Sequence, residues 1–169
     1  ATSIGGHDAV DVPLVITNGG WYRANCSLPA SLSTISNTFS FSVSILRMPD
    51  APLSVADLDV GPMTSGQNKE GTINIGAVLD AVMFAVSNAC RVEFRMGQMT
   101  ANEVPNVRLY NPNGIALTND FPPDYRAEFT RFLTQTGIYT IVCNDQLNAV
   151  GKYAVSLAVI PGPIDLSSD

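Results

Sequence analysis

Alternation of apolar and polar side chains with a period of two residues limits most strongly what this chain can fold into. Residues 39–45 read Phe-Ser-Phe-Ser-Val-Ser-Ile. Successive side chains of a strand point to opposite faces, so this run places its apolar groups on one face and its hydroxyls on the other. The same period recurs in residues 82–86, 92–96, 107–109, 139–143 and 153–159, whereas a helical period is almost absent. The chain is therefore predicted to be all-β.

Glycine and proline separate these runs. Asn111-Pro112-Asn113-Gly114 combines a proline, which fixes φ near −65°, with a glycine, which tolerates positive φ. This turn is predicted to join residues 107–110 and 115–118 as a hairpin. Short strands punctuated in this way are typical of an antiparallel β-sandwich or jelly roll with little or no helix.

The length of 169 residues fits one domain. Within a single domain covering residues 1–169, we expect N-terminal strands or an assembly arm in 1–47 and a jelly-roll-like portion in 71–160. Residues 48–70 contain three prolines and two glycines and are predicted to be a long connection. Residues 161–169 are predicted to be a tail.

Charge excludes several classes of function. Charged residues make up only 14% of the chain, and its net charge is −6, which repels phosphate backbones and argues against nucleic-acid binding. No apolar run reaches the roughly 18 residues of a spanning helix. The single histidine, His7, leaves most histidine-based catalytic and zinc sites without their ligands. We therefore expect a chain that is not an enzyme, makes no nucleic-acid contact and has no membrane span.

The three cysteines, Cys26, Cys90 and Cys143, are too few for a disulfide framework. Cys90 and Cys143 have the phase of inward-facing strand residues. They are interpreted either as buried free thiols or as a disulfide pair, and the second alternative implies an oxidising compartment.

Carboxylates offer two candidate sites. Asp57 and Asp59 are a candidate calcium site, although calcium usually takes six to eight oxygen ligands and a solvated acidic loop is the better explanation of the pair. No other cofactor is expected. Glu93 and Glu128 are a candidate glycosidase pair. Glu93, however, alternates with Arg91 and Arg95, which indicates ion pairing on a polar strand face.

The N-terminal region is unusually poor in charge. Between residues 1 and 46 the charged side chains are Asp8, Asp11 and Arg23. Exposed strands are normally guarded by charge, so these strands are either buried in the chain's own sandwich or meet another subunit. In the second case we expect a homo-oligomer with Val12, Val15 and Trp21 as apolar anchors. Trp21 and Tyr22 also have the ring chemistry for stacking on a sugar.

Residues 71–160 carry a series of short motifs. In order, the most distinctive are Asp80-Ala-Val-Met-Phe, Asn111-Pro-Asn-Gly, Thr136-Gly-Ile-Tyr and Gly151-Lys-Tyr-Ala-Val. Together they resemble the bacterial pre-peptidase C-terminal (PPC-like) domain. The resemblance implies a jelly-roll-like β-sandwich and a secreted accessory module, some members of which bind substrate polymers or calcium. It departs from the family pattern after Asp80, where Ala and Val precede the apolar Met83 and Phe84.

Two functions follow as hypotheses. The first is a non-catalytic structural protein that self-associates into a repeated assembly, as a subunit of a capsid, a virion decoration or an extracellular filament. It is favoured by the low charge and the unguarded N-terminal strands, and it places the protein outside the cell or on a virion surface. The alternative is a secreted PPC-like accessory module that recognises a polymer or carbohydrate.

Overall fold

The computed structural model describes residues 19, 21–23, 60–74, 78–101, 104–120, 126–147 and 149–162. Within these ranges the chain forms strands and no helix, and therefore no helix long and apolar enough to cross a membrane. The strands are β1 (Gly61–Pro62), β2 (Asn68–Ile73), β3 (Asp80–Val86), β4 (Cys90–Gln98), β5 (Pro105–Tyr110), β6 (Ala116–Asp120), β7 (Arg126–Leu133), β8 (Gly137–Asp145) and β9 (Gly151–Pro161). The all-β prediction is confirmed.

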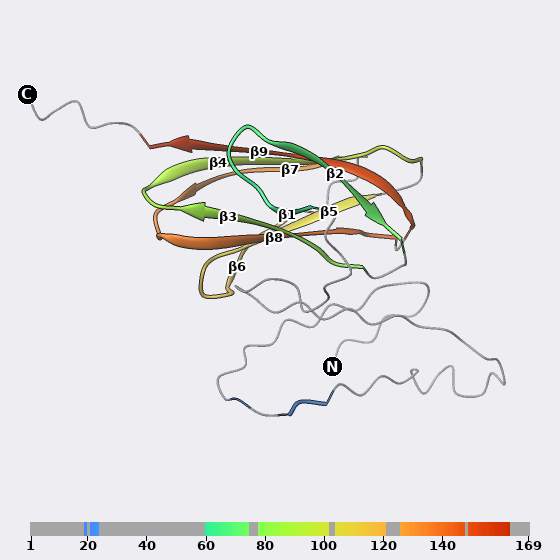
Figure 1. The fold of residues 1–169 in the computed structure, drawn as a ribbon, viewed down its shortest axis with the longest axis horizontal. Helices are drawn as coiled ribbons and strands as arrows, with labels where there is room; N and C mark the ends of the chain where they lie inside the picture. Colours follow the sequence, from blue (N-terminus) through green and yellow to red (C-terminus); the bar gives the residue numbers. More distant parts are fainter. Residues whose placement is uncertain are drawn as a thin grey trace, which may run out of the picture.

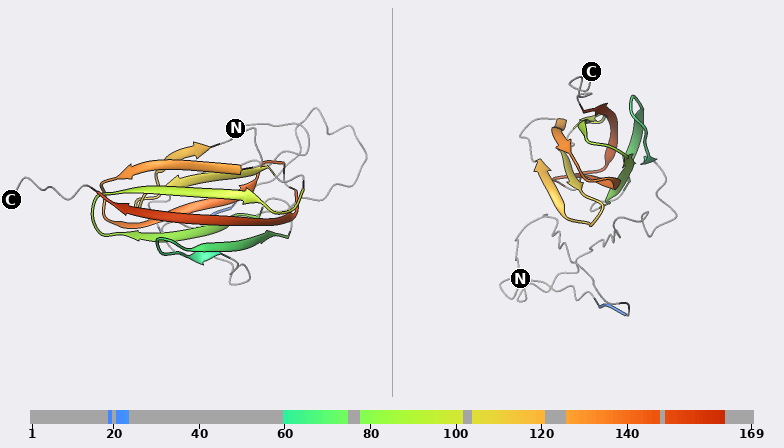
Figure 2. Two further views of the ribbon diagram at one scale, coloured as in Figure 1. Left: turned by 90° about the horizontal axis from the view of Figure 1, so that it is seen from above. Right: turned by 90° about the vertical axis from the view of Figure 1, so that its left-hand side faces the viewer.

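The strands form two facing sheets. One has five strands in the order β1-β3-β8-β5-β6, and the other has four in the order β2-β9-β4-β7. Every pairing is antiparallel except that of β1 with β3. Figure 1 shows β2, β9, β4 and β7 as one layer over the other sheet, and the end-on view in Figure 2 shows the two layers facing each other. The predicted β-sandwich is therefore present.

Several sequence boundaries can be compared with the strands. Residues 107–110 lie in β5 and residues 116–118 lie in β6, and the two strands pair antiparallel, as the hairpin prediction requires. Asn111 closes this turn by accepting hydrogen bonds at Oδ1 from the backbone N–H groups of Asn113 (3.0 Å) and Ile115 (2.9 Å). Gly114 adopts φ 75°, the positive value expected of it. In the range predicted as a connection, β1 and the first residues of β2 are already strands; the alternating run 39–45 lies outside the described residues.

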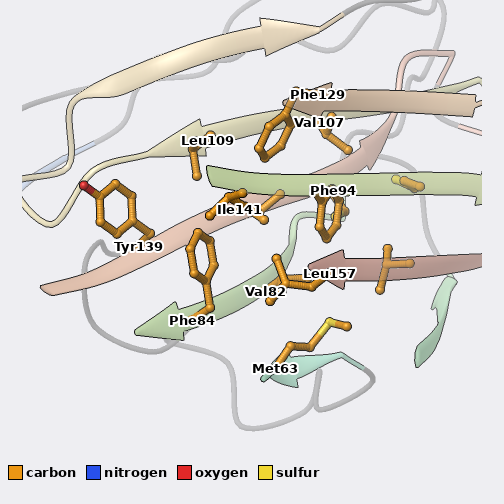
Figure 3. Close-up of a cluster of buried hydrophobic side chains, with 14 of the residues drawn as sticks. Met63, Val82, Phe84, Phe94, Val107, Leu109, Phe129, Tyr139, Ile141 and Leu157 are labelled. Carbon is orange, nitrogen blue, oxygen red and sulfur yellow. The ribbon is translucent and has the colours of Figure 1, made fainter. Parts of the chain in front are cut away.

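The core lies between the sheets and follows the alternation. Inward-facing residues of β3, β4, β5, β8 and β9 form one buried cluster, shown in Figure 3. Phe84 stacks on Tyr139 with ring centroids 5.6 Å apart, and Phe94 stacks on Phe129 at 5.7 Å. Offset aromatic pairs at this distance add to the free energy gained by burying the rings. The core therefore fixes which face of every strand remains for solvent or a partner.

Cys90 and Cys143 are both buried free thiols. Asp80 pairs with Cys143, and Val86 pairs with Gly137 at the other end of the same two strands. Cys90 follows Val86 by one short turn, so it lies at the end of the sandwich opposite Cys143, roughly 20 Å away at about 3.3 Å per strand residue. Disulfide geometry needs Cα atoms within about 7 Å. The structure therefore has the first of the two alternatives and not the disulfide.

Candidate functional site

The outer face of the four-stranded sheet carries the densest set of polar side chains on the described strands. By strand alternation, the residues opposite the core are Arg91, Glu93, Arg95 and Gly97 on β4, Arg126, Glu128, Thr130 and Phe132 on β7, Lys152, Ala154, Ser156, Ala158 and Ile160 on β9, and Asn68, Glu70 and Thr72 on β2. We call this surface the polar face. Its antiparallel registers place these residues in rows across the sheet.

Ion pairs join the charged residues of the polar face to each other. Arg91 Nη2 lies 3.1 Å from Glu93 Oε1, and Arg95 Nε lies 3.3 Å from Glu128 Oε2. Arg126 Nη2 reaches the other oxygen of Glu128 at 4.0 Å. All these side chains are at least one third exposed, so each pair contributes about 0–1 kcal/mol to folding. The predicted ion pairing of Arg91, Glu93 and Arg95 is confirmed, and its effect is to hold the side chains in place.

A strip of small side chains runs along β9 beside this charged row. Ala154, Ser156 and Ala158 are partly buried, and Gly97 of β4 pairs with Ala154. A shallow hollow of about 220 Å³ borders the strip and is lined by Ser156 and Ala158 together with Glu93 and Arg95. A second one, of about 200 Å³, lies on the other side of Glu93 and Arg95, between β4 and β7. The sheet is therefore recessed along β9, and a flat or extended partner can approach the backbone closely there.

Phe132 gives one end of the polar face an aromatic surface. Its side chain is 58% exposed, and Arg91 faces it across the β4–β7 pair. On the other side of Arg91 lies Ile160 of β9. An exposed ring beside hydrogen-bonding groups is an arrangement that favours contact with a partner that has both apolar and polar surfaces.

The polar face is nearly neutral although the chain is acidic. Arg91, Arg95, Arg126 and Lys152 supply four positive charges, and Glu70, Glu93 and Glu128 supply three negative ones, so the sum is +1. A surface of this kind has no strong field to attract a polyanion or a polycation. It instead offers many hydrogen-bond donors and acceptors to an uncharged partner.

Glu93 and Glu128, the candidate glycosidase pair, do lie on the same face and on neighbouring strands. Glu128 is opposite Arg95, and Glu93 is opposite Thr130 one row away. Each carboxylate is paired with an arginine on an open surface. A glycosidase needs a protonated carboxyl shielded from water as its acid. This arrangement supplies two paired carboxylates and no shielded acid.

Asp80, the first residue of the motif series, has a structural role between the two sheets. It is the first residue of β3, is 4% exposed, and its Oδ2 accepts a hydrogen bond from the buried Tyr153 hydroxyl. The Tyr153 ring lies directly over Gly71 of β2, leaving no room for a Cβ there. The aspartate, the ring and the glycine therefore join β3 of one sheet to β9 and β2 of the other.

Other sequence-predicted residues are not brought together by the described structure. Val12, Val15, Asp57 and Asp59 lie outside the described residues. Trp21 is described and its side chain is fully exposed. Among the described ranges, no group of three or more His, Cys, Asp or Glu side chains has the arrangement of a metal site.

Sequence reasoning did not single out Phe132 or the strip along β9. Residues 126–133 show the alternation Ala127, Phe129, Leu133, but Arg131 interrupts it at an inward-phase position. Because β7 is an edge strand, Arg131 reaches solvent at the open side of the sandwich. Without that tertiary information, the sequence pattern did not identify residues 126–133 as a strand. The outward orientation of Phe132 was therefore not predicted either.

No protein-family model matches the chain, and no curated protein matches it by sequence. Among solved structures, the chain is similar to the pre-peptidase C-terminal domain of collagenase from Bacillus anthracis, with a TM-score of 0.51 and 14% identity over 58% of this chain and 93% of that one. Periplasmic inhibitors of g-type lysozyme, PliG, from Salmonella Typhimurium and Aeromonas hydrophila align with TM-scores of 0.43 and 0.41, at 16% and 11% identity. Each alignment spans 59% of this chain, with 98% and 96% of the respective inhibitors. The first match confirms the predicted resemblance at the level of fold.

Proposed function

We propose that this chain, whose β-sandwich is similar in fold to a pre-peptidase C-terminal domain, is a non-catalytic accessory module. In this proposal it binds an uncharged polymer through the polar face. The observation that carries the proposal is the composition of that face. It combines an ion-paired row on β4 and β7, a recessed strip of small residues on β9, and one exposed ring at Phe132.

The shape of the polar face supports binding over catalysis. Its hollows are shallow and open, and sites that enclose small substrates are usually concave pockets of about 300–1,000 Å³. An extended polymer, in contrast, needs a long shallow surface with many weak contacts. The strip occupies the middle of β9, from Ala154 to Ala158, and together with the ion-paired row beside it gives such a surface.

The chemistry of the face favours a polysaccharide. The near-neutral sum of charges disfavours a polyelectrolyte, while arginine and glutamate side chains held by ion pairs present fixed donors and acceptors for hydroxyl and amide groups. The Phe132 ring offers an apolar surface for one sugar ring. We further propose that the module is secreted, because the PPC resemblance implies an accessory role outside the cell.

Pull-down on insoluble polymers tests this function. The full chain is mixed with chitin or cellulose, two uncharged polysaccharides, and the fraction of protein removed from solution is measured as a function of polymer concentration. We expect saturable binding to one of them. Loss of the ring in Phe132→Ala should weaken that binding roughly fivefold, as expected for about 1 kcal/mol of aromatic contact.

A matched pair of arginine variants provides the control. Arg95→Ala removes a side chain at the centre of the polar face, whereas Arg131→Ala removes an exposed arginine of opposite phase on β7. Binding should weaken with Arg95→Ala and stay unchanged with Arg131→Ala. No binding to any polymer, or equal effects of the two variants, would contradict the proposal.

Self-association remains a second candidate, favoured by the full exposure of the Trp21 side chain. An apolar ring left entirely in water gains free energy when another subunit covers it. Size-exclusion chromatography with light scattering measures this directly. A monomer of 18.0 kDa at high concentration contradicts the candidate. An oligomer that Trp21→Ala dissociates supports it.

A further inference from the structure

The turn between β5 and β6 contains an Asn-Gly pair. Asn113 is exposed, and Gly114 follows it with φ 75°. The side-chain amide of an asparagine is open to attack by the backbone nitrogen of the next residue, and glycine hinders this attack least because it has no side chain. A Cβ at Gly114 would meet no atom within 4 Å, so this side of the turn is open to water. Asn113 therefore has the exposure and the neighbour that deamidation requires.

The folded turn, however, engages the attacking nitrogen. The N–H of Gly114 donates to the backbone oxygen of Asn111 at 2.9 Å, and the N–H of Asn111 donates to the backbone oxygen of Ile115, also at 2.9 Å. Attack on the Asn113 side chain needs the Gly114 nitrogen to lose its proton and to turn towards that side chain. Both steps break the hydrogen bond to Asn111, so the reaction requires the turn to open first.

The side chain of Asn111 resists this opening. Its Oδ1 accepts hydrogen bonds from the backbone N–H groups of Asn113 (3.0 Å) and Ile115 (2.9 Å). Its Nδ2 donates to Gln135 Oε1 at 3.4 Å, and Gln135 belongs to the turn between β7 and β8, so a second turn holds the Asn111 amide in place. Loss of the two hydrogen bonds at Oδ1 should make opening of the turn at least about fivefold more frequent.

We propose that Asn113 is a site of spontaneous deamidation and that Asn111 is a positioning residue that sets its rate. In the open turn, hydroxide removes the amide proton of Gly114, and the nitrogen forms a bond to Cγ of Asn113. The side-chain amide leaves as ammonia, with the electron pair of the broken C–N bond and a proton from water, which gives a cyclic imide between the two residues. Water then adds to either carbonyl carbon of this ring, and the product is aspartate or isoaspartate. Hydroxide is regenerated, so water is the only molecule consumed.

Either product changes the turn. Each adds one negative charge to a chain whose net charge is already −6, and isoaspartate also lengthens the main chain by one methylene group. The hydrogen bonds of Asn113, Gly114 and Ile115 depend on the native backbone spacing, so isoaspartate cannot keep all of them. Among the described strands, β6 pairs with β5 alone. The register of β6 on β5 is therefore the part of the sandwich that this reaction loosens.

Peptide mapping of the full chain during incubation at mildly alkaline pH tests the proposal. Mass spectrometry gives the rate at which Asn113 is converted, and fragmentation by electron transfer distinguishes isoaspartate from aspartate. Asn111→Ala should raise this rate at least about fivefold. Asn111→Asp keeps oxygen acceptors for both N–H groups and should react no faster than the parent. An unchanged rate in Asn111→Ala, or an equal acceleration by both variants, overturns the proposal.

The chain unfolded in urea supplies the reference rate. The sequence contains one other Asn-Gly pair, Asn18-Gly19, so in urea Asn113 and Asn18 should react at similar rates. In the folded chain Asn113 should react at least about tenfold more slowly than in urea, because the turn must open first. Equal rates for Asn113 in the folded chain and in urea overturn the proposal. A rate for Asn113 in urea far below that of Asn18 also overturns it, since the adjacent Pro112 and not the folded turn would then account for the slow reaction.

Hydrogen exchange of the parent chain, measured by NMR, needs no variant. It decides the case in which Asn111→Ala opens the sandwich, which alkylation of the buried Cys143 would reveal. Exchange of the Gly114 amide proton, like deamidation, requires this N–H to leave its hydrogen bond. The protection of this proton and the slowing of deamidation should therefore agree within a few-fold. A Gly114 amide that exchanges as fast in the folded chain as in urea overturns the proposal.

Discussion

Replacing Gly71 by alanine is the sharpest test of how the two sheets are held together. A Cβ at Gly71 would lie 2.3 Å from both Cζ and the hydroxyl oxygen of Tyr153, and 2.8 Å from Cε1. The ring cannot move away easily, because it is fully buried and its hydroxyl donates to Asp80. Gly71→Ala must therefore shift β2 or break the bond to the carboxylate.

The expected loss is about 3 kcal/mol of unfolding free energy. Overpacking a core costs about 1–3 kcal/mol, and weakening a hydrogen bond to a buried charged group adds about 1–3 kcal/mol, of which local relaxation recovers a part. For a chain of this length the loss corresponds to a fall in Tm of roughly 6–12 °C. Urea denaturation followed by circular dichroism gives the free energy directly.

Gly97→Ala is the matched control, because Gly97 also lies within a strand but a Cβ there meets no atom within 4 Å. Its stability should stay within about 0.5 kcal/mol of the parent or rise slightly. In a Tyr153→Leu background, Gly71→Ala should cost far less than in the parent, since the ring that it meets is gone. Equal stabilities of the two alanine variants would refute this account of the contact between β2 and β9.

Three further predictions follow from the buried polar groups. Burial raises the pKa of the Cys143 thiol well above its usual 9.0, and the Asp80 carboxylate raises it further. The neutral thiol therefore stabilises the fold fully below pH 9, and this stability falls above pH 9 by up to about 1.4 kcal/mol per pH unit. Urea titrations between pH 8 and 10.5 should show the fall, and Cys143→Ala should make it smaller, with a remainder from Cys90, whose thiol pKa is also raised by burial. Asp145 accepts hydrogen bonds from the backbone N–H groups of Val104, Leu147 and Ala149. Asp145→Ala should therefore lower the free energy of unfolding by about 2–3 kcal/mol, and Asp145→Asn should lower it less, as measured by thermal unfolding. Equal Tm values for the alanine variant and the parent would contradict this role. Alkylation without reductant should modify Cys90 and Cys143 only after unfolding, and failure to label them in denaturant would indicate that they are oxidised.

Much of the fold was predictable because its signals are local. The inward residues of β3, β4, β5, β8 and β9 were identified by alternation, and the Asn111–Gly114 hairpin by its turn residues. β7 was not recognised, because Arg131 breaks its alternation at a position that only an edge strand can tolerate. The candidate site was predicted in part: the ion-paired row on β4 was expected, whereas Phe132 and the strip on β9 were not.

The amino-acid sequence by itself determined which side of each strand is apolar, because the two-residue period of a strand is a property of the backbone. Only the tertiary structure decided which strands are neighbours, since pairing depends on contacts between residues far apart in the chain. That order placed Cys90 and Cys143 at opposite ends of the sandwich, set Tyr153 over Gly71, and gathered the charges of β4 and β7 onto one face.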